Sequence, residues 1–147
     1  MGSEMCIRDS GSPSSLDFDP GDSVSLGGLD VNGTEVTLAA WVKADSFTGP
    51  NFDGRIISKA DALAANRHVF MLATRIVNGT DAELQGRVRI GGQTATFRAR
   101  SGVMVPGVWY HTAMVYDGST AKLYLDCLLY TSPSPRDLST SRMPSSA

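Results

Sequence analysis

The sequence is poor in cysteine and glutamate, and it has no long apolar run. Its cysteines are Cys6 and Cys127, near the two ends of the chain, so the stretch between them offers no disulfide, thiolate metal ligand or nucleophilic thiol. No apolar run approaches the roughly 20 residues that span a bilayer. Lys and Arg number 13 and Asp and Glu number 15, a net charge of −2 with both signs interspersed. This balance gives no indication of nucleic-acid binding or membrane insertion.

Both ends of the chain are unusual at the level of DNA. Met5–Ser10 back-translates to ATG TGT ATA AGA GAC AG, and Cys127–Ser132 to TGT CTC TTA TAC ACA TCT. These stretches are reverse complements over nearly their whole length and resemble the transposon end used in sequencing libraries. The flanking codons extend the match, so we interpret residues 1–10 and 127–147 as translated adapter DNA. The second segment is then expected to be disordered or non-native, and the natural domain is the fragment 11–126.

Short apolar runs broken by Gly, Asp, Asn and Pro follow one another through this fragment, which is typical of an all-β protein. The predicted strands are Leu16–Phe18, Ser23–Leu26, Val36–Lys43, Arg55–Lys59, His68–Arg75, Leu84–Ile90, Thr94–Arg100, Tyr110–Tyr116 and Lys122–Asp126. Turns at Gly91-Gly92 and at Asp117–Thr120 predict hairpins, because glycine tolerates positive φ. Antiparallel strands joined in this way predict a two-sheet jelly-roll sandwich.

Alternation along two of these strands predicts which faces are buried. In the strand that begins at Leu84, Leu84 and Val88 share one face, and Gln85 and Arg87 share the other. The first face is predicted to be core and the second to be exposed to solvent. Along Val36–Val42 both faces are mostly apolar, which predicts a central strand.

An ordered set of motifs covers nearly all of the fragment. It consists of Leu16–Asp19 with Asp22–Val24, then Val36–Lys43, Ile56–Lys59, Trp109–Gly118 and Leu123–Asp126. In this order the motifs resemble the laminin-G-like, concanavalin A-like jelly-roll superfamily, in the form common in large bacterial secreted and surface proteins. The resemblance implies that the last motif continues with a glycine and further strands. Since these are missing, the jelly roll is expected to be incomplete and to expose open sheet edges.

The carboxylates do not form the pattern of a glycosidase. A retaining glycosidase needs two carboxyl groups about 5 Å apart. Glu35 and Glu83 each stand alone in the sequence. Asp17 and Asp19 have a suitable spacing, but they lie in the opening motif, where a role beside a turn is the preferred interpretation. We therefore expect no catalysis by this domain.

The loop Ala44–Gly54 holds the predicted ligand-binding site. Phe47, Asn51, Phe52 and Asp53 combine aromatic faces with amide and carboxylate groups. In the alternative interpretation, the two phenylalanines tuck back onto the edge of the sandwich.

Three further aromatic side chains have two interpretations each. Trp41 and Trp109 suit stacking on sugar rings, but both fall within apolar motifs, so core packing is preferred. His111 has the chemistry of a general base, and a packed, hydrogen-bonded core residue is again preferred.

Calcium is the cofactor that the family resemblance leaves open. Asp45, Asp53 and Asp117 are candidates by composition, yet none lies in a dense acidic loop. Each is better interpreted as a turn residue that accepts hydrogen bonds from its own turn.

The resemblance implies a non-catalytic recognition module that binds carbohydrate or a surface glycoconjugate, within a larger secreted or cell-surface protein. Two alternatives stay open. One is a structural or protein-interaction domain of an adhesin, with no sugar ligand. The other is an accessory domain of a polysaccharide-degrading enzyme whose catalytic residues lie elsewhere.

Overall fold

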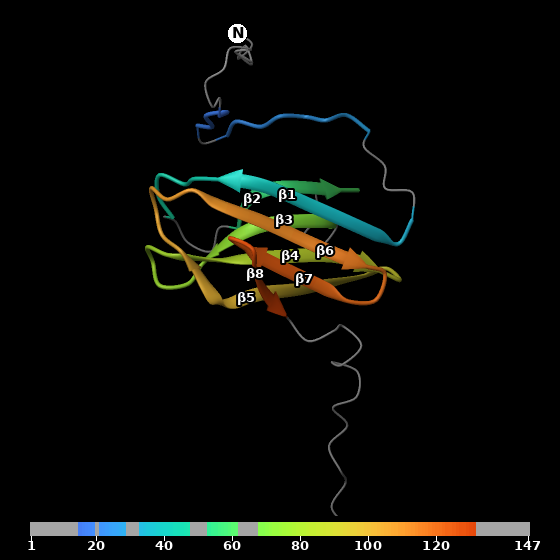
Figure 1. Ribbon diagram of the computed structural model, residues 1–147. Helices are drawn as coiled ribbons and strands as arrows, with labels where there is room; N and C mark the ends of the chain where they lie inside the picture. Colours follow the sequence, from blue (N-terminus) through green and yellow to red (C-terminus); the bar gives the residue numbers. More distant parts are fainter. Residues whose placement is uncertain (1–14, 20, 29–32, 48–52, 62–67, 132–147) are drawn as a thin grey trace, which may run out of the picture. The chain divides into compact units, whose positions relative to one another are not determined.

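The computed structural model describes part of the chain (Figure 1). The described residues are 15–19, 21–28, 33–47, 53–61 and 68–131. The chain divides into two units, Met1–Asp30 and Val31–Ala147.

In the first unit, the described residues form extended backbone and a turn. The N–H of Asp22 donates to the carbonyl oxygen of Asp19 at 2.9 Å, and the N–H of Asp19 donates to the Asp22 carboxylate at 3.1 Å. These bonds confirm the role of Asp19 beside a turn. The predicted strands Leu16–Phe18 and Ser23–Leu26 do not form. A strand needs a partner for its backbone groups, and the described residues of this unit provide none.

In the second unit, the described residues form eight strands in two antiparallel sheets (Figure 1). The strands are β1 (Glu35–Val42), β2 (Asp53–Ala60), β3 (His68–Ile76), β4 (Ala82–Ile90), β5 (Gln93–Met104), β6 (Tyr110–Asp117), β7 (Ala121–Leu125) and β8 (Leu128–Thr131). Sheet A has the order β1-β6-β7-β8, and sheet B the order β2-β3-β4-β5. This arrangement confirms the predicted all-β sandwich. Among the described residues, no helix is long and apolar enough to cross a membrane.

The strands β1 to β7 lie where the sequence predicts strands. The largest difference is in β5, which runs on from the predicted end at Arg100 to Met104. Both predicted hairpins are confirmed. Gly91 and Gly92 join β4 to β5 with φ angles of 55° and 81°, and Gly118 has a φ of 85° in the turn between β6 and β7. Side chains with a Cβ rarely adopt these angles, which is why glycine occupies the turns.

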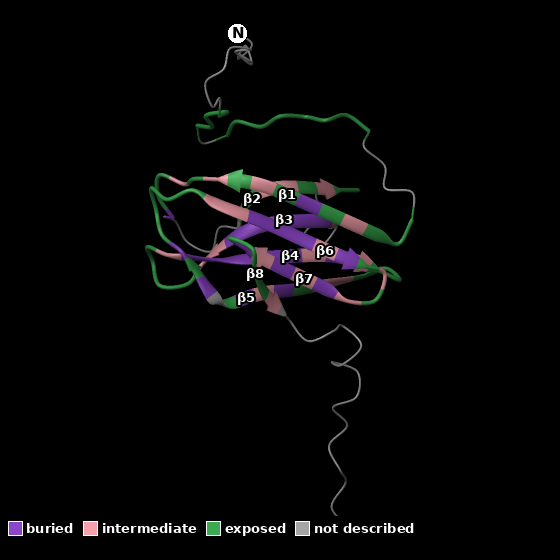
Figure 2. Ribbon diagram, viewed as in Figure 1, coloured by how far each residue is buried: buried purple, intermediate pink, exposed green. Residues whose placement is uncertain are grey.

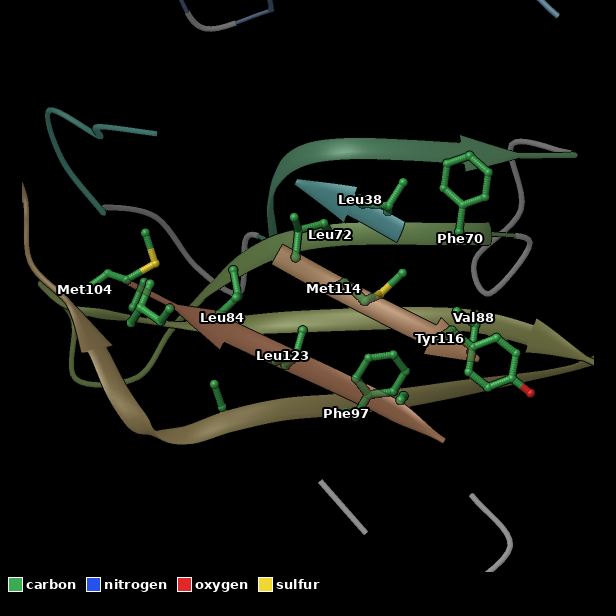
Figure 3. Packing of buried hydrophobic residues seen from close by; sticks show 14 of the residues in the cluster. Leu38, Phe70, Leu72, Leu84, Val88, Phe97, Met104, Met114, Tyr116 and Leu123 are labelled. Carbon is green, nitrogen blue, oxygen red and sulfur yellow. The ribbon is translucent and has the colours of Figure 1, made fainter. Parts of the chain in front are cut away.

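The core lies between the two sheets (Figures 2 and 3). Leu84 of β4, Met114 of β6 and Leu123 of β7 are fully buried there. At Gly86 a Cβ would collide with the ring of Phe97 and with the sulfur of Met114. The predicted core face of β4 is thus confirmed, and each such side chain contributes roughly 1.5–3 kcal/mol by burial.

Strand β1 is an edge of sheet A within the described residues, not the predicted central strand. It pairs with β6 on one side. Leu38 points into the core, whereas Thr37, Ala39 and Trp41 on the other face are exposed. The prediction is wrong because alanine and tryptophan on the outward face imitate the pattern of a strand that is buried on both sides.

Strand β8 lies in the segment interpreted as translated DNA. It pairs with β7 after a tight turn in which Asp126 and Cys127 both have positive φ, 48° and 66°. Tyr130 of β8 packs against the core beside Gly102, where a Cβ would lie 2.9 Å from the tyrosine Cζ. Residues 128–131 therefore form a strand where the sequence predicts disorder or a non-native conformation. The DNA origin of the segment stays a prediction.

Candidate functional site

The predicted ligand-binding loop is described only in part. Phe47 is 6% exposed and belongs to the core, so the alternative in which it tucks back onto the sandwich is correct for this ring. Asn51 and Phe52 lie outside the described residues. Asp53 begins β2 opposite Arg75, and its side chain also lies outside that part. The described residues of the loop do not assemble a site, and the four-residue site stays a prediction.

Both tryptophans lie on the surface. Trp41 is 65% exposed and Trp109 is 46% exposed, so the prediction of core packing is wrong for both. The alternation of β1 explains the exposure of Trp41. Leu38 and Val42 point inward, and Trp41 is an odd number of residues from each of them, so its side chain points outward. The outward face of sheet A therefore carries both indole rings of the chain.

Trp41, Lys43, Trp109 and His111 form a group that we call the tryptophan patch. Trp41 is paired with His111 between β1 and β6, and their ring centroids are 5.3 Å apart with planes inclined at 60°. Just beyond the last pair of this register, Val42 with Tyr110, Nζ of Lys43 lies 5.6 Å from the centroid of the Trp109 ring. Edge-to-face and cation–π contacts of this kind orient aromatic rings. The patch therefore presents oriented aromatic surface to solvent.

His111 differs in part from its predicted role. Its ring is packed, but against Trp41 on the outward face and not within the core. Its backbone N–H donates to the Asp126 carboxylate at 2.8 Å. Its Nδ1 atom is buried and has no hydrogen-bond partner within the described residues. Because this nitrogen has no exposed surface, His111 contributes to the patch through the contact of its ring with Trp41.

Small residues continue the same face beside the patch. Ala39 of β1 is paired with Ala113 of β6, and Ala113 is paired with Tyr124 of β7. The short side chains of Ala39 and Ala113 leave a flat strip next to Trp41, bordered by Tyr124 on the side of β7. An aromatic ring beside a flat strip, with a carboxylate and an imidazole at its margin, suits the apolar face and the hydroxyls of a sugar.

The Asp117 carboxylate is engaged by its own turn. It accepts hydrogen bonds from the N–H of Thr120 at 2.7 Å, the N–H of Ser119 at 3.0 Å and the Ser119 hydroxyl at 2.9 Å. These bonds, led by that of Thr120, hold the pKa of Asp117 below its usual range. The turn interpretation of this residue is confirmed. Within the described residues, no group of three His, Cys, Asp or Glu side chains is placed to hold a metal ion.

Glu35 and Glu83, the glutamates of the fragment 11–126, lie far apart. Glu35 lines a pocket of about 240 Å³ that also contacts Ile90 at the end of β4. Glu83, near the start of β4, is 7% exposed, and its Oε1 lies 3.6 Å from Nε of Arg98. The strand from Glu83 to Ile90 extends about 23 Å at roughly 3.3 Å per residue. This separation is too large for a glycosidase pair.

Comparisons with known proteins gave matches of different strength. No curated protein matches the sequence. A solved structure of a polysaccharide lyase of family 18 matches at 18% identity with a TM-score of 0.44, covering 68% of this chain and 46% of that one. The chain thus spans less than half the length of that structure. The family model described as the concanavalin A-like lectin/glucanases superfamily matches residues 18–141. This match takes in both sheets, and the chain belongs to the concanavalin A-like lectin/glucanases superfamily.

Proposed function

We propose that this chain is a non-catalytic carbohydrate-recognition module of a larger secreted or cell-surface protein, and that it binds sugar through the tryptophan patch. The observation that carries the proposal is the exposure of Trp41 and Trp109, 65% and 46%, on one face of sheet A. Neighbouring exposed aromatic side chains mark surfaces that bind partners. Membership of the superfamily supports carbohydrate as the class of ligand.

In this mode of binding, the C–H face of a pyranose lies on the ring of Trp41. The flat strip at Ala39 and Ala113 leaves room for the next sugar along the chain. The exposed Asp126 carboxylate, next to His111, then accepts hydrogen bonds from ring hydroxyls at the margin. These contacts favour a neutral polysaccharide, because they combine apolar stacking with acceptors for hydroxyl groups.

The positions and partners of the carboxylates support a binding role and not a hydrolytic one. Glu83 faces a guanidinium at 3.6 Å, and Glu35 lies near the opposite end of β4. Asp117 is held by its turn. An accessory domain of a polysaccharide-degrading enzyme would use the same patch, whereas an adhesin domain without a sugar ligand would leave it unused.

The test is affinity electrophoresis of the full chain through gels that contain neutral glucans, xylans, mannans or galactans. We expect retardation by at least one polymer, and about tenfold weaker binding for Trp41→Ala and for Trp109→Ala, since loss of a stacking contact is worth about 1.4 kcal/mol. Val77→Ala is the matched control, because Val77 is exposed and lies in the turn between β3 and β4. Its mobility should equal that of the unchanged chain.

Fluorescence provides a second readout for the same variants. The chain has 2 tryptophans, both in the patch, so any change in indole emission on titration reports on this surface alone. A double variant, Trp41→Ala with Trp109→Ala, that still binds the retarding polymer would refute the proposed site. Failure of every neutral polymer to bind would refute the proposed ligand class.

A further inference from the structure

The outward face of sheet B holds a polar side chain that the sequence predicts to be exposed but the structure buries. Gln85 of β4 is fully buried. Its Oε1 accepts a hydrogen bond from Nε of Arg98 at 3.2 Å, while its Nε2 has no partner within the described residues. A guanidinium only donates, so this bond fixes the amide with its oxygen toward Arg98 and its nitrogen turned away. The result is an oriented, buried donor that lacks an acceptor.

Gln85 belongs to a row of residues that crosses sheet B. The pairing register places Arg55 of β2, Ala73 of β3, Gln85 of β4 and Arg98 of β5 side by side. Figure 1 shows the four strands that carry them. Adjacent strands are about 4.8 Å apart, so the backbones of Arg55 and Arg98 are separated by about 14 Å. Ala73, between them, contributes only a methyl group. Two long cationic side chains and one amide donor therefore flank a position with a minimal side chain.

The neighbouring rows of this face also carry arginines. Among the described side chains, arginines lie at Arg55, Arg75, Arg87, Arg89 and Arg98, and carboxylates lie at Asp61 and Glu83. Arginines outnumber carboxylates among these described side chains, in a chain whose net charge is −2. Asp61 and Glu83 are paired with Arg89 and Arg98. The face therefore attracts an anion although the chain as a whole is acidic.

We propose that the row Arg55, Ala73, Gln85 and Arg98, here called the arginine row, binds the carboxylate of an acidic, uronate-bearing polysaccharide. Arginine presents paired N–H groups that match a carboxylate, and Nε2 of Gln85 gains the acceptor that it lacks. Ala73 and Gln85 are both 0% exposed, so binding requires that the side chains above them move aside. The site lies on the opposite sheet from the tryptophan patch and does not depend on it.

Calorimetric titration of the full chain with polygalacturonate, and with its uncharged methyl ester, tests the site. We expect binding of the acid and at least tenfold weaker binding of the ester. Arg55→Gln should weaken binding of the acid about tenfold, the effect of losing a charge-assisted hydrogen bond. Gln85→Met should weaken it by a similar factor without lowering Tm, because methionine fills the same space and removes the unpaired donor. Lys122→Gln, which removes a positive charge from sheet A, is the matched control and should bind within twofold of the unchanged chain.

Several outcomes would overturn the proposal. Equal affinity for polygalacturonate and its ester would do so, as would unchanged binding by Arg55→Gln. Dextran sulfate bound as tightly as polygalacturonate, by both the unchanged chain and Arg55→Lys, would show attraction by charge alone. Loss of acid binding in Trp41→Ala would show that the two surfaces are one site. If Gln85→Met fails to fold, the Arg55 variants still test the proposal. Arg55 is exposed on β2, an edge strand within the described residues, so its replacement should not prevent folding.

Discussion

The outward faces of the two sheets differ in what they expose and what they bury. Sheet A exposes Trp41 and Trp109, which are apolar enough to belong in a core. Sheet B buries the polar side chain of Gln85, whose amide nitrogen has no hydrogen-bond partner among the residues that the structure describes. In most proteins apolar side chains are buried and polar ones are exposed. Sheet A departs from this distribution by exposing apolar rings, and sheet B departs from it by burying a polar side chain. Such departures are expected where a surface is shaped for a ligand and not for stability.

The difference also separates the kinds of ligand that each face suits. Exposed rings and small residues around Trp41 favour apolar stacking, which depends little on salt. The arginines around Gln85 favour a charged group, whose binding weakens as salt screens the charges. If both proposals hold, one sandwich offers a neutral surface and a cationic surface on the outward faces of its two sheets.

The largest difference in the free energy of unfolding is expected between two neighbours on β4. Leu84 and Gln85 are both 0% exposed but point to opposite faces of the sheet. Leu84→Ala should lower the free energy of unfolding by about 2–5 kcal/mol, because it leaves a cavity between the sheets. Gln85→Met should change it by less than about 1.5 kcal/mol, or raise it, since it removes an unpaired buried donor. Urea denaturation followed by circular dichroism measures both. A loss at Gln85→Met as large as that at Leu84→Ala would mean that Gln85 is a structural residue.

A crossed set of variants and ligands tests whether the two faces are independent. Trp109→Ala should weaken binding of the neutral polymer about tenfold and leave polygalacturonate unaffected, while Arg55→Gln should do the reverse. The double variant should show both losses without further change, because sites on opposite sheets share no contacts and their effects add. The measurement is the affinity of four proteins for two ligands. Coupling greater than about 0.5 kcal/mol would contradict independent faces.

Much of the fold follows from local pattern. Gly91-Gly92 and the Asp117 turn predict their hairpins correctly, because positive φ and the bonds of an aspartate to its own turn are local requirements. The alternation of Leu84 and Val88 identifies the core face of β4. By contrast, Leu16–Phe18 has the composition of a strand but no described partner, and pairing is not a local property.

The sites are less predictable because alternation separates two faces without saying which one is covered. Trp41 and Gln85 show the two errors that result, an apolar residue predicted inside and a polar residue predicted outside. A usable signal was present in the spacing: Trp109 and His111 are two residues apart, so they share a face that is opposite to that of Tyr110 and Thr112. Recognising that face as outward required the pairing of β6 with β1.

The turn before β8 tests how sheet A ends. Cys127 has a φ of 66°, a conformation that costs a residue with a Cβ about 1 kcal/mol. Cys127→Gly should therefore raise the free energy of unfolding by about 0.5–1 kcal/mol, measured by urea denaturation in the presence of a reductant. Asp126→Gly is the matched control: its φ is 48°, but its carboxylate accepts the N–H of His111 at 2.8 Å, so this change should not stabilise. Equal effects of the two changes would argue against the turn as described.

The smallest effect is expected at Asp117, whose turn borders both strands of the β6–β7 hairpin but neither ligand surface. The N–H groups of Thr120 and Ser119 and the Ser119 hydroxyl lower the pKa of Asp117, so the ionised form is favoured by folding. This contribution is complete above the pKa of the unfolded chain and is lost as pH falls through the lower pKa of the folded chain. Asp117→Asn keeps an acceptor oxygen but has no charge to lose. Its stability should therefore fall slightly below that of the unchanged chain at neutral pH, and the difference should shrink on acidification, as followed by thermal melts over an acidic pH series. A difference that grows toward acid would mean that the carboxylate destabilises the turn.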